Sequence, residues 1–170
     1  TGIYKKLPEQ IDSNDKSTKE KVYYNACKWY AQNYDEINEA FQKIAEFNFE
    51  NGGYYEVNMG NAYDYISKFK ESGYFSDNYI KSLENSFEEI KKNLEENKQN
   101  DGALEGMDAD WFLATQEIDS YLDIINNQMK LSDITIYSDD DNVLCISNED
   151  MGKFLILQVK QYGDEWLIEK

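Results

Sequence analysis

The chain has 170 residues, with 34 acidic and 17 basic side chains, a net charge of −17 and no His. Every basic residue is Lys, so neither imidazole nor guanidinium is present. This composition excludes His-dependent nucleophilic catalysis, His metal ligands and bidentate Arg contacts with phosphate. The strong negative charge also disfavours nucleic acid and anionic membranes as partners.

The first sixteen residues differ from the rest of the sequence. Residues 1–16 are mostly polar, contain the only proline (Pro8) and show no apolar periodicity, so we expect a flexible tether there. Residues 17–170 have the length of one domain. No run reaches 18 apolar residues, so no membrane-spanning segment is predicted, and no signal peptide is visible.

A long amphipathic helix is predicted over about 18–48. Ser17 and Glu20 have the spacing of a capping box at its start. Asn33 interrupts the apolar stripe, and the glycines of 51–53 are expected to end the helix. The stripe at three- and four-residue spacing consists of Val22, Ala26, Trp29, Ile37, Phe41, Ile44 and Phe47.

Three further helices are predicted before residue 127. The first is expected from Asn61 to Ser72, where Gly73 closes it. Ser76 is expected to cap the next, which has a regular apolar stripe as far as Leu94. The polar stretch 95–102 is predicted as a loop, and a last helix is predicted over about 108–126.

The period of the apolar pattern changes from 3.6 to 2 after residue 127. Strands are predicted over 134–138, 143–147, 153–161 and 165–170, separated by short turns rich in Asp, Asn and Gly. Strands joined by such short loops pair antiparallel, so a four-stranded meander is expected. Helices followed by a meander indicate an α+β domain with helices on one face of a curved sheet.

The segment 97–108 aligns with an EF-hand calcium loop. Gly102 stands at the sixth position of that frame. However, Asn97, Gln99 and Asp108 occupy the ligand positions at which stronger acidic ligands are usual. An ordinary loop is therefore favoured, and no metal is predicted.

Asp108 and Asp110 form the most suggestive carboxylate pair. Two close carboxyls can carry out acid–base chemistry or bind a divalent ion. They also stand at a predicted helix start, where negative charge is favourable without any chemistry. Gln116, among apolar neighbours in the same segment, is expected to be partly buried and hydrogen-bonded.

The excess of Tyr allows two interpretations. Tyr is favoured where a surface must be both apolar and hydrogen-bonding, which makes Tyr30 and Tyr34, with Trp111, candidate binding residues. Alternatively, the 14 Tyr replace aliphatic residues at the rim of the core. The second interpretation is the more common outcome.

Nothing in the sequence predicts a catalytic residue or a cofactor. Cys27 and Cys145 do not form a CxxC motif, and they are expected to be two small buried residues or, in an exported protein, one disulfide. No Gly-x-Ser-x-Gly, Walker or GxGxxG pattern occurs. An enzyme is therefore not predicted.

Segments 69–76 and 105–117 resemble the bacterial DUF3828 family of exported and lipoprotein-like domains. Segments 154–159 and 163–168 are similar to the closing hairpin of NTF2-like cone folds. The resemblance implies an NTF2-like cone with its helices packed on the sheet, and a place in the bacterial envelope, periplasmic or held at the outer membrane by an upstream lipid anchor. It implies no particular reaction.

Three hypotheses of function follow. The first is a non-catalytic envelope protein that binds a basic protein partner, for example an immunity protein that blocks a toxin; it predicts an exposed patch rich in Tyr and Asp. The second is a small-ligand binder, which predicts an apolar cavity between the first helix and the sheet. The third is a hydrolase, with Asp108 and Asp110 converging in a cleft.

Overall fold

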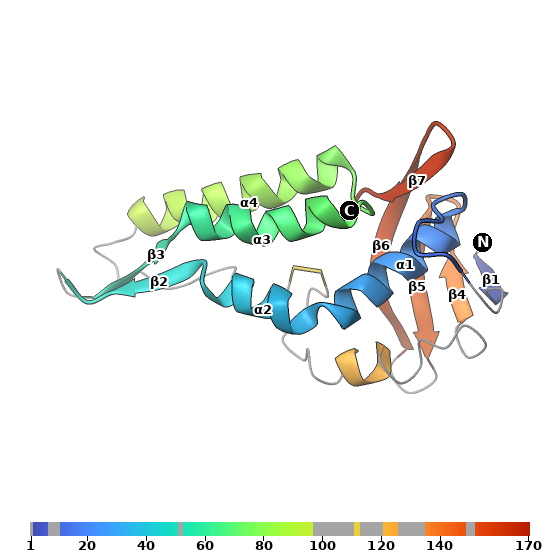
Figure 1. The fold of residues 1–170 in the computed structure, drawn as a ribbon, viewed down its shortest axis with the longest axis horizontal. Coiled ribbons are helices and arrows are strands. Elements are labelled where there is room, and N and C mark those ends of the chain that lie inside the picture. Colours follow the sequence, from blue (N-terminus) through green and yellow to red (C-terminus); the bar gives the residue numbers. More distant parts are fainter. Residues whose placement is uncertain are drawn as a thin grey trace.

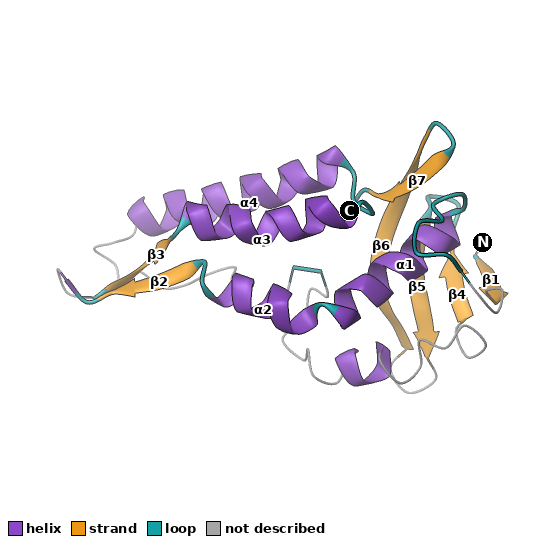
Figure 2. Ribbon diagram, viewed as in Figure 1, coloured by secondary structure: helices purple, strands orange, loops and turns teal. Residues whose placement is uncertain are grey.

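The structure is a computed structural model that describes residues 2–6, 11–50, 53–96, 111–112, 121–125, 135–148 and 152–170. An antiparallel sheet with one helix against it forms one end of the molecule, which we call the sheet end. Three helices and a β-hairpin extend from it as an arm (Figures 1 and 2). The mixed α/β class with an antiparallel sheet is thus confirmed, whereas the NTF2-like cone stays a prediction.

The predicted meander is present and gains a fifth strand. β4 (Thr135–Ser138), β5 (Val143–Asn148), β6 (Gly152–Tyr162) and β7 (Glu165–Ile168) pair antiparallel in chain order. β1 (Ile3–Lys6) is added at the edge, so the order is β1-β4-β5-β6-β7. The meander was predictable because each of its pairings joins neighbours in the sequence.

β1 lies within the segment that was expected to be a tether. It pairs with β4 from Ile3, opposite Ser138, to Lys6, opposite Thr135. Lys5 also forms an ion pair of 3.3 Å with the buried carboxylate of Glu20. The tether prediction missed this strand because four residues show no clear period, and because the partner strand is more than 120 residues away.

The long helix predicted over 18–48 is two helices. α1 (Lys19–Gln32) ends at Asn33, whose side-chain amide donates to the Trp29 carbonyl at 2.8 Å, and α2 (Tyr34–Gln42) follows. The N-cap of α1 is Thr18, which accepts from the Lys21 backbone N–H at 3.3 Å. The predicted cap, Ser17, instead donates its hydroxyl to Asp15.

A β-hairpin replaces the last turns of that predicted helix. β2 (Ala45–Asn48) pairs antiparallel with β3 (Tyr54–Val57), so the prediction of helix up to residue 48 is wrong. A short apolar run can satisfy a period of 2 as well as one of 3.6. The glycines that were expected to end a helix belong to the stretch that connects two strands.

The two helices that follow lie within two residues of their predicted ranges, and α3 begins at Met59 rather than at Asn61. α3 (Met59–Ser72) ends at Gly73, whose φ of 80° is the left-handed conformation that glycine adopts without strain. α4 (Asp77–Glu96) is capped by Ser76, whose hydroxyl accepts from the Tyr79 backbone N–H at 3.1 Å. α4 continues into the predicted loop 95–102 as far as Glu96.

The helix predicted over 108–126 is described only in part. Trp111 and Phe112 lie in a turn rather than in a helix, so the prediction is wrong there, whereas 121–125 are helical as expected. The remaining residues of that segment lie outside the described part of the chain.

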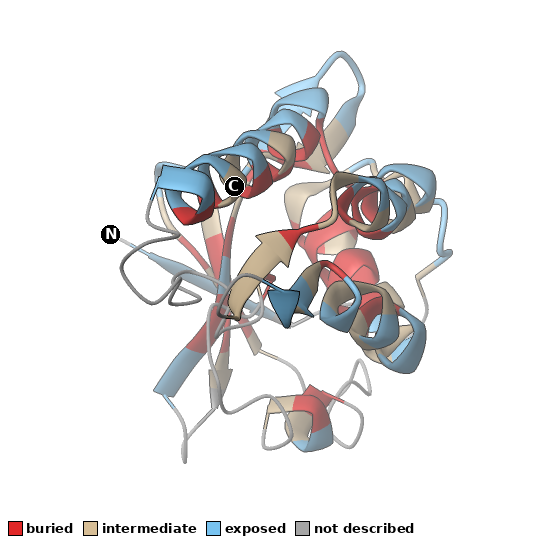
Figure 3. Cartoon of the chain, turned by 90° about the vertical axis from the view of Figure 1, so that its left-hand side faces the viewer, coloured by how far each residue is buried: buried red, intermediate tan, exposed pale blue. Residues whose placement is uncertain are grey.

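The arm and the sheet end share one core. Phe69 of α3 has no exposed surface, and its ring packs against Trp29 of α1 and Phe75, which lies between α3 and α4. The backbone beside Phe75 pairs with β7, because Ser76 donates to the Ile168 carbonyl and Ile168 donates to that of Tyr74, each at 2.8 Å. In Figure 3 the buried sides of the helices face inward around this core.

Candidate functional site

The aromatic residues singled out from the sequence lie together, but as internal packing. Tyr30 has no exposed surface and stacks on Phe112, with ring centroids 4.4 Å apart. Tyr34 and Trp111 are half-buried; Tyr34 meets the Tyr30 ring edge-on and Trp111 meets Phe87 of α4. Tyr30 therefore belongs to the core and is not presented to a partner.

The other candidates from the same segment cannot be placed. Asp108, Asp110 and Gln116 lie outside the described residues, as does the segment 97–108 that aligned with a calcium loop. The binding and hydrolase roles considered for them stay predictions.

Six of the 14 Tyr side chains are buried in the core, and the other eight are half-buried or exposed. Tyr23 donates its hydroxyl to the Leu155 carbonyl at 2.6 Å, and Tyr74 donates to the Ser13 carbonyl at 2.8 Å. The six buried Tyr do not contribute to the Tyr-rich surface that the first hypothesis anticipated, and that surface stays a prediction. The buried Tyr residues are Tyr23, Tyr24, Tyr30, Tyr65, Tyr74 and Tyr79.

The expected ligand cavity between the first helix and the sheet is occupied by packed side chains. Val22 and Ala26 of α1 have no exposed surface, and Tyr23 reaches the backbone of β6. Leu155, the acceptor on β6, has a φ of 52° beside a register shift in the pairing with β5. These described side chains are thus packed at the contact between α1 and the sheet, and the small-ligand hypothesis stays a prediction.

Both cysteines are buried and unbridged. Burial raises the pKa of Cys27 to about 12, and it also raises the pKa of Cys145. Neither sulfur is a thiolate at neutral pH, so neither is activated as a nucleophile. The expectation of two small buried residues is confirmed.

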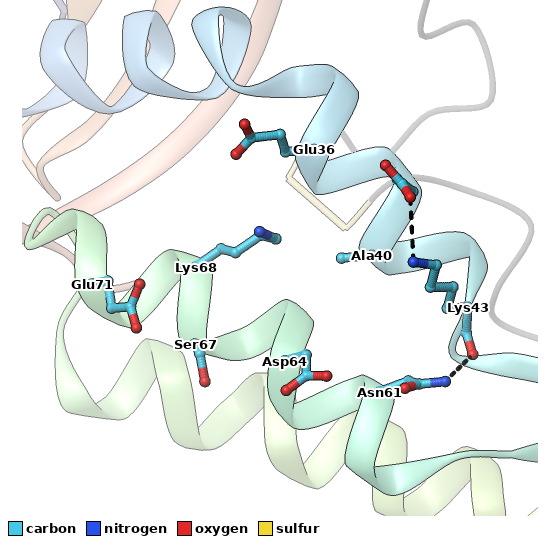
Figure 4. Close-up of a pocket in the computed structure, with 9 residues that line it drawn as sticks. Glu36, Ala40, Lys43, Asn61, Asp64, Ser67, Lys68 and Glu71 are labelled. Carbon is cyan, nitrogen blue, oxygen red and sulfur yellow. Dashed lines mark hydrogen bonds and ion pairs between the residues drawn. The ribbon is translucent and has the colours of Figure 1, made fainter.

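A groove of about 560 Å³ lies between α2 and α3. Figure 4 shows the side chains of the two helices facing each other across it, with Lys68 of α3 directed toward α2. The Asn61 side chain closes one end by donating to the Lys43 carbonyl at 2.8 Å. The lining residues are Glu36, Glu39, Ala40, Lys43, Asn61, Asp64, Ser67, Lys68 and Glu71.

Carboxylates dominate both walls of this groove. Lys43 forms an ion pair of 3.2 Å with Glu39 of its own helix. Within the described part of the chain, Glu36, Asp64 and Glu71 take part in no ion pair. Three acidic groups therefore face the groove without an ion pair, and their repulsion is reduced by Lys68, which also lines the groove, and by solvent, salt or a bound cation.

An aromatic surface continues the groove toward the sheet end. A second hollow of about 350 Å³ shares Glu36, Lys68 and Glu71 with the groove and adds Trp29 of α1. Trp29 is half-buried, and its ring is fixed edge-on against Phe69 and Phe75. A fixed indole beside carboxylates is a favourable place for the charged head and the apolar stem of a Lys or Arg side chain.

The dimensions of the groove suit a short segment of polypeptide. Asn61 and Glu71 are ten residues apart on α3, which corresponds to about 15 Å of helix. Four of the nine lining residues are acidic and two are Lys, so the groove carries a net negative charge that favours binding of cations.

Sequence reasoning did not find this groove. Glu36 and Glu39 on α2, and Asp64 and Glu71 on α3, have the three- to seven-residue spacing of exposed helix faces. That spacing predicts which residues face outward on each helix. It does not predict that the two outward faces meet, since this depends on the break at Asn33 and on the hairpin that returns the chain.

Metal ligation and membrane spanning are two further properties that the described residues bear on. No group of three or more Cys, Asp or Glu side chains among them is placed to hold a metal ion. Of the described helices, none combines the length and apolar character needed to cross a bilayer.

Comparisons with protein-family models, curated proteins and solved structures each find no match for this chain. The resemblance to the DUF3828 family therefore stays a prediction from the sequence motifs. Only part of the 105–117 motif, Trp111 and Phe112, is among the described residues.

Proposed function

We propose that the protein is a non-catalytic binding protein that receives a basic segment of another protein in the groove between α2 and α3. The observation that carries this proposal is the set of three carboxylates, Glu36, Asp64 and Glu71, that face the groove without an ion pair among the described residues. A basic segment would neutralise them, and Trp29 would contact the apolar stem of a Lys or Arg side chain.

The net charge of −17 supports the same class of partner. Long-range attraction increases the association rate of an oppositely charged partner, and it weakens as salt is added. Together with the sequence resemblance, this favours a role in the bacterial envelope, for example as an immunity protein that blocks a basic toxin. The proposal includes that location, periplasmic or at the outer membrane.

The test is a titration with a defined probe, a 12-residue helical peptide of Lys and Gln. Amide chemical shifts should change along α2 and α3, around Glu36, Asp64 and Lys68. The Glu36→Lys/Asp64→Lys variant should weaken binding about tenfold, because it replaces attraction by repulsion on both walls.

A matched control distinguishes the effect of the groove carboxylates on binding from the effect of the total net charge. Glu88→Lys/Glu89→Lys changes the net charge equally, at exposed positions of α4 that do not line the groove. This variant should weaken binding less than threefold. Equal losses for the two double variants would mean that the peptide responds to total charge alone, and the proposal would then be wrong.

A further inference from the structure

An exposed aromatic cluster lies on the hairpin that joins α2 to α3. Phe47 on β2 is 44% exposed and Phe49, just after β2, is 85% exposed. Their ring centroids are 4.8 Å apart, and Phe47 also meets Tyr55, its cross-strand neighbour on β3, at 5.1 Å. We call Phe47, Phe49 and Tyr55 the aromatic cluster.

The cluster is ordered by the backbone of the hairpin. A Cβ atom added to Gly53 would lie 2.8 Å from the ring of Phe47, so that ring lies directly over this glycine. Gly53 has a φ of +79°, which a larger residue would adopt only with strain. The Phe47 ring is therefore fixed by its contacts with Gly53 and Tyr55, whereas Phe49 contacts the cluster through Phe47 and is mostly exposed.

Carboxylates lie on the same hairpin as the cluster, and Lys91 of α4 lines a hollow beside Tyr55. Glu46 lies directly opposite Glu56 in the strand register, on the face of the hairpin opposite that of Phe47 and Tyr55, and Glu50 follows Phe49. No Lys occurs between Lys43 and Lys68 in the sequence. Like charges at directly opposed positions destabilise a strand pair, and a cationic partner would remove this cost.

A small hollow adjoins the cluster on its α4 side. It has a volume of about 210 Å³, and Tyr55, Leu94, Glu56 and Glu95 are among the residues that line it. Leu94 and Tyr55 provide an apolar surface, and the two glutamates leave a net negative charge although Lys91 also lines the hollow. This combination suits a long basic side chain that ends in a charge.

Figure 1 shows the hairpin at the far end of the arm, with α2 leading into β2 and β3 leading into α3. The groove between α2 and α3 therefore has the hairpin at one end and Trp29 toward the other. The Asn61–Lys43 hydrogen bond closes the groove at the hairpin end, so a basic segment reaches the hairpin by passing over this bond.

We propose that the aromatic cluster is the apolar half of the same contact, which inserts between apolar side chains of the basic partner. This inference rests on the proposed function, because it assigns a second contact to the same partner. The partner is thus an amphipathic cationic segment with both Lys or Arg and apolar side chains. A second copy of this chain is disfavoured by its own charge of −17 and by the Glu46–Glu56 pair.

The experiment compares two peptides of equal charge and length, one of Lys and Leu and the other of Lys and Gln. Both should shift amides of the groove, and only the Lys–Leu peptide should shift amides 45–48 and 54–57. Phe49→Ser should weaken binding of the Lys–Leu peptide about tenfold and leave the affinity for the Lys–Gln peptide unchanged.

Tyr63→Ser serves as the matched control, since Tyr63 is an aromatic residue of α3 that is 45% exposed and lines no described groove. It should change neither affinity. Phe49 is so exposed that its loss does not threaten the fold, which circular dichroism of the variant would confirm.

Each alternative result has a distinct meaning. If the Lys–Leu peptide shifts the groove and not the hairpin, this inference is wrong and the proposed function stands. If neither peptide shifts the groove, the proposed function fails. If Phe49→Ser abolishes self-association of the protein alone, or its binding to phosphatidylcholine vesicles, the cluster serves a second copy or a bilayer and the inference is overturned.

Discussion

The sheet end and the arm place some of the same kinds of residue differently. At the sheet end, Tyr23 is buried and donates to Leu155, and the buried Glu20 pairs with Lys5, although Tyr4 and Tyr162 are exposed there. On the arm, Phe49 and the carboxylates of the groove face solvent. Composition alone therefore does not locate a binding surface, because the aromatic residues of this chain form both a core and an exposed cluster.

The largest effect should come from a core Phe at the boundary between the two regions. Phe69→Ala removes a fully buried ring that contacts Trp29 and Phe75, and it should reduce the free energy of unfolding by about 3–5 kcal/mol. Phe49→Ala, the same change at an exposed site, should alter it by no more than about 0.5 kcal/mol. Urea denaturation measures both, and similar losses would contradict the distinction between the regions.

An intermediate effect is expected inside the sheet end. Tyr23→Phe removes the hydroxyl that bonds to Leu155 and leaves a buried carbonyl without its donor, which should cost about 1–3 kcal/mol. Burial raises the pKa of Tyr23 well above its ordinary value, so the hydroxyl remains a donor at all moderate pH values. The exposed Tyr63→Phe is the control, and an equal response in thermal unfolding would argue against a structural role for the Tyr23 hydroxyl.

The smallest effect concerns the loop before α1 and depends on pH. Hydrogen bonds from Ser17 and Lys21 lower the pKa of Asp15 to about 2, from 3.8. Since the folded-state pKa is the lower one, the stabilisation is complete above the ordinary pKa and is lost as the pH falls toward 2. The melting temperatures of wild type and Asp15→Asn should therefore differ at pH 7 and converge near pH 2; a constant difference would show that the ionised carboxylate is not the cause.

Local patterns predicted the elements whose determinants are local. The strands β4 to β7 follow from alternation and short turns, and the ends of α3 and α4 follow from Gly73 and Ser76. β1 was missed because its partner β4 is more than 120 residues away, and β2 was missed because its apolar residues also fit the helical period of the stripe before it.

The candidate site could not be predicted for a different reason. Glu36 and Asp64 are 28 residues apart in the sequence, and they share a groove only because the hairpin reverses the chain between α2 and α3. The predicted site residues Tyr30 and Tyr34 were chosen for their type, and the structure uses Tyr30 for packing. The sequence shows which side chains are acidic or aromatic. It does not show which helix surfaces lie next to each other in the fold.

The backbone pairing between the α3–α4 connection and β7 has a consequence for measurement. The amide hydrogens of Ser76 and Ile168 are both held by carbonyls on the opposite side of this junction. They exchange with deuterated solvent only when the junction separates. Their protection factors therefore report the equilibrium between the closed junction and the state in which the arm is detached from the sheet. A ligand that bridges both regions should slow the exchange of these two hydrogens together, whereas a ligand confined to the arm should leave them unchanged.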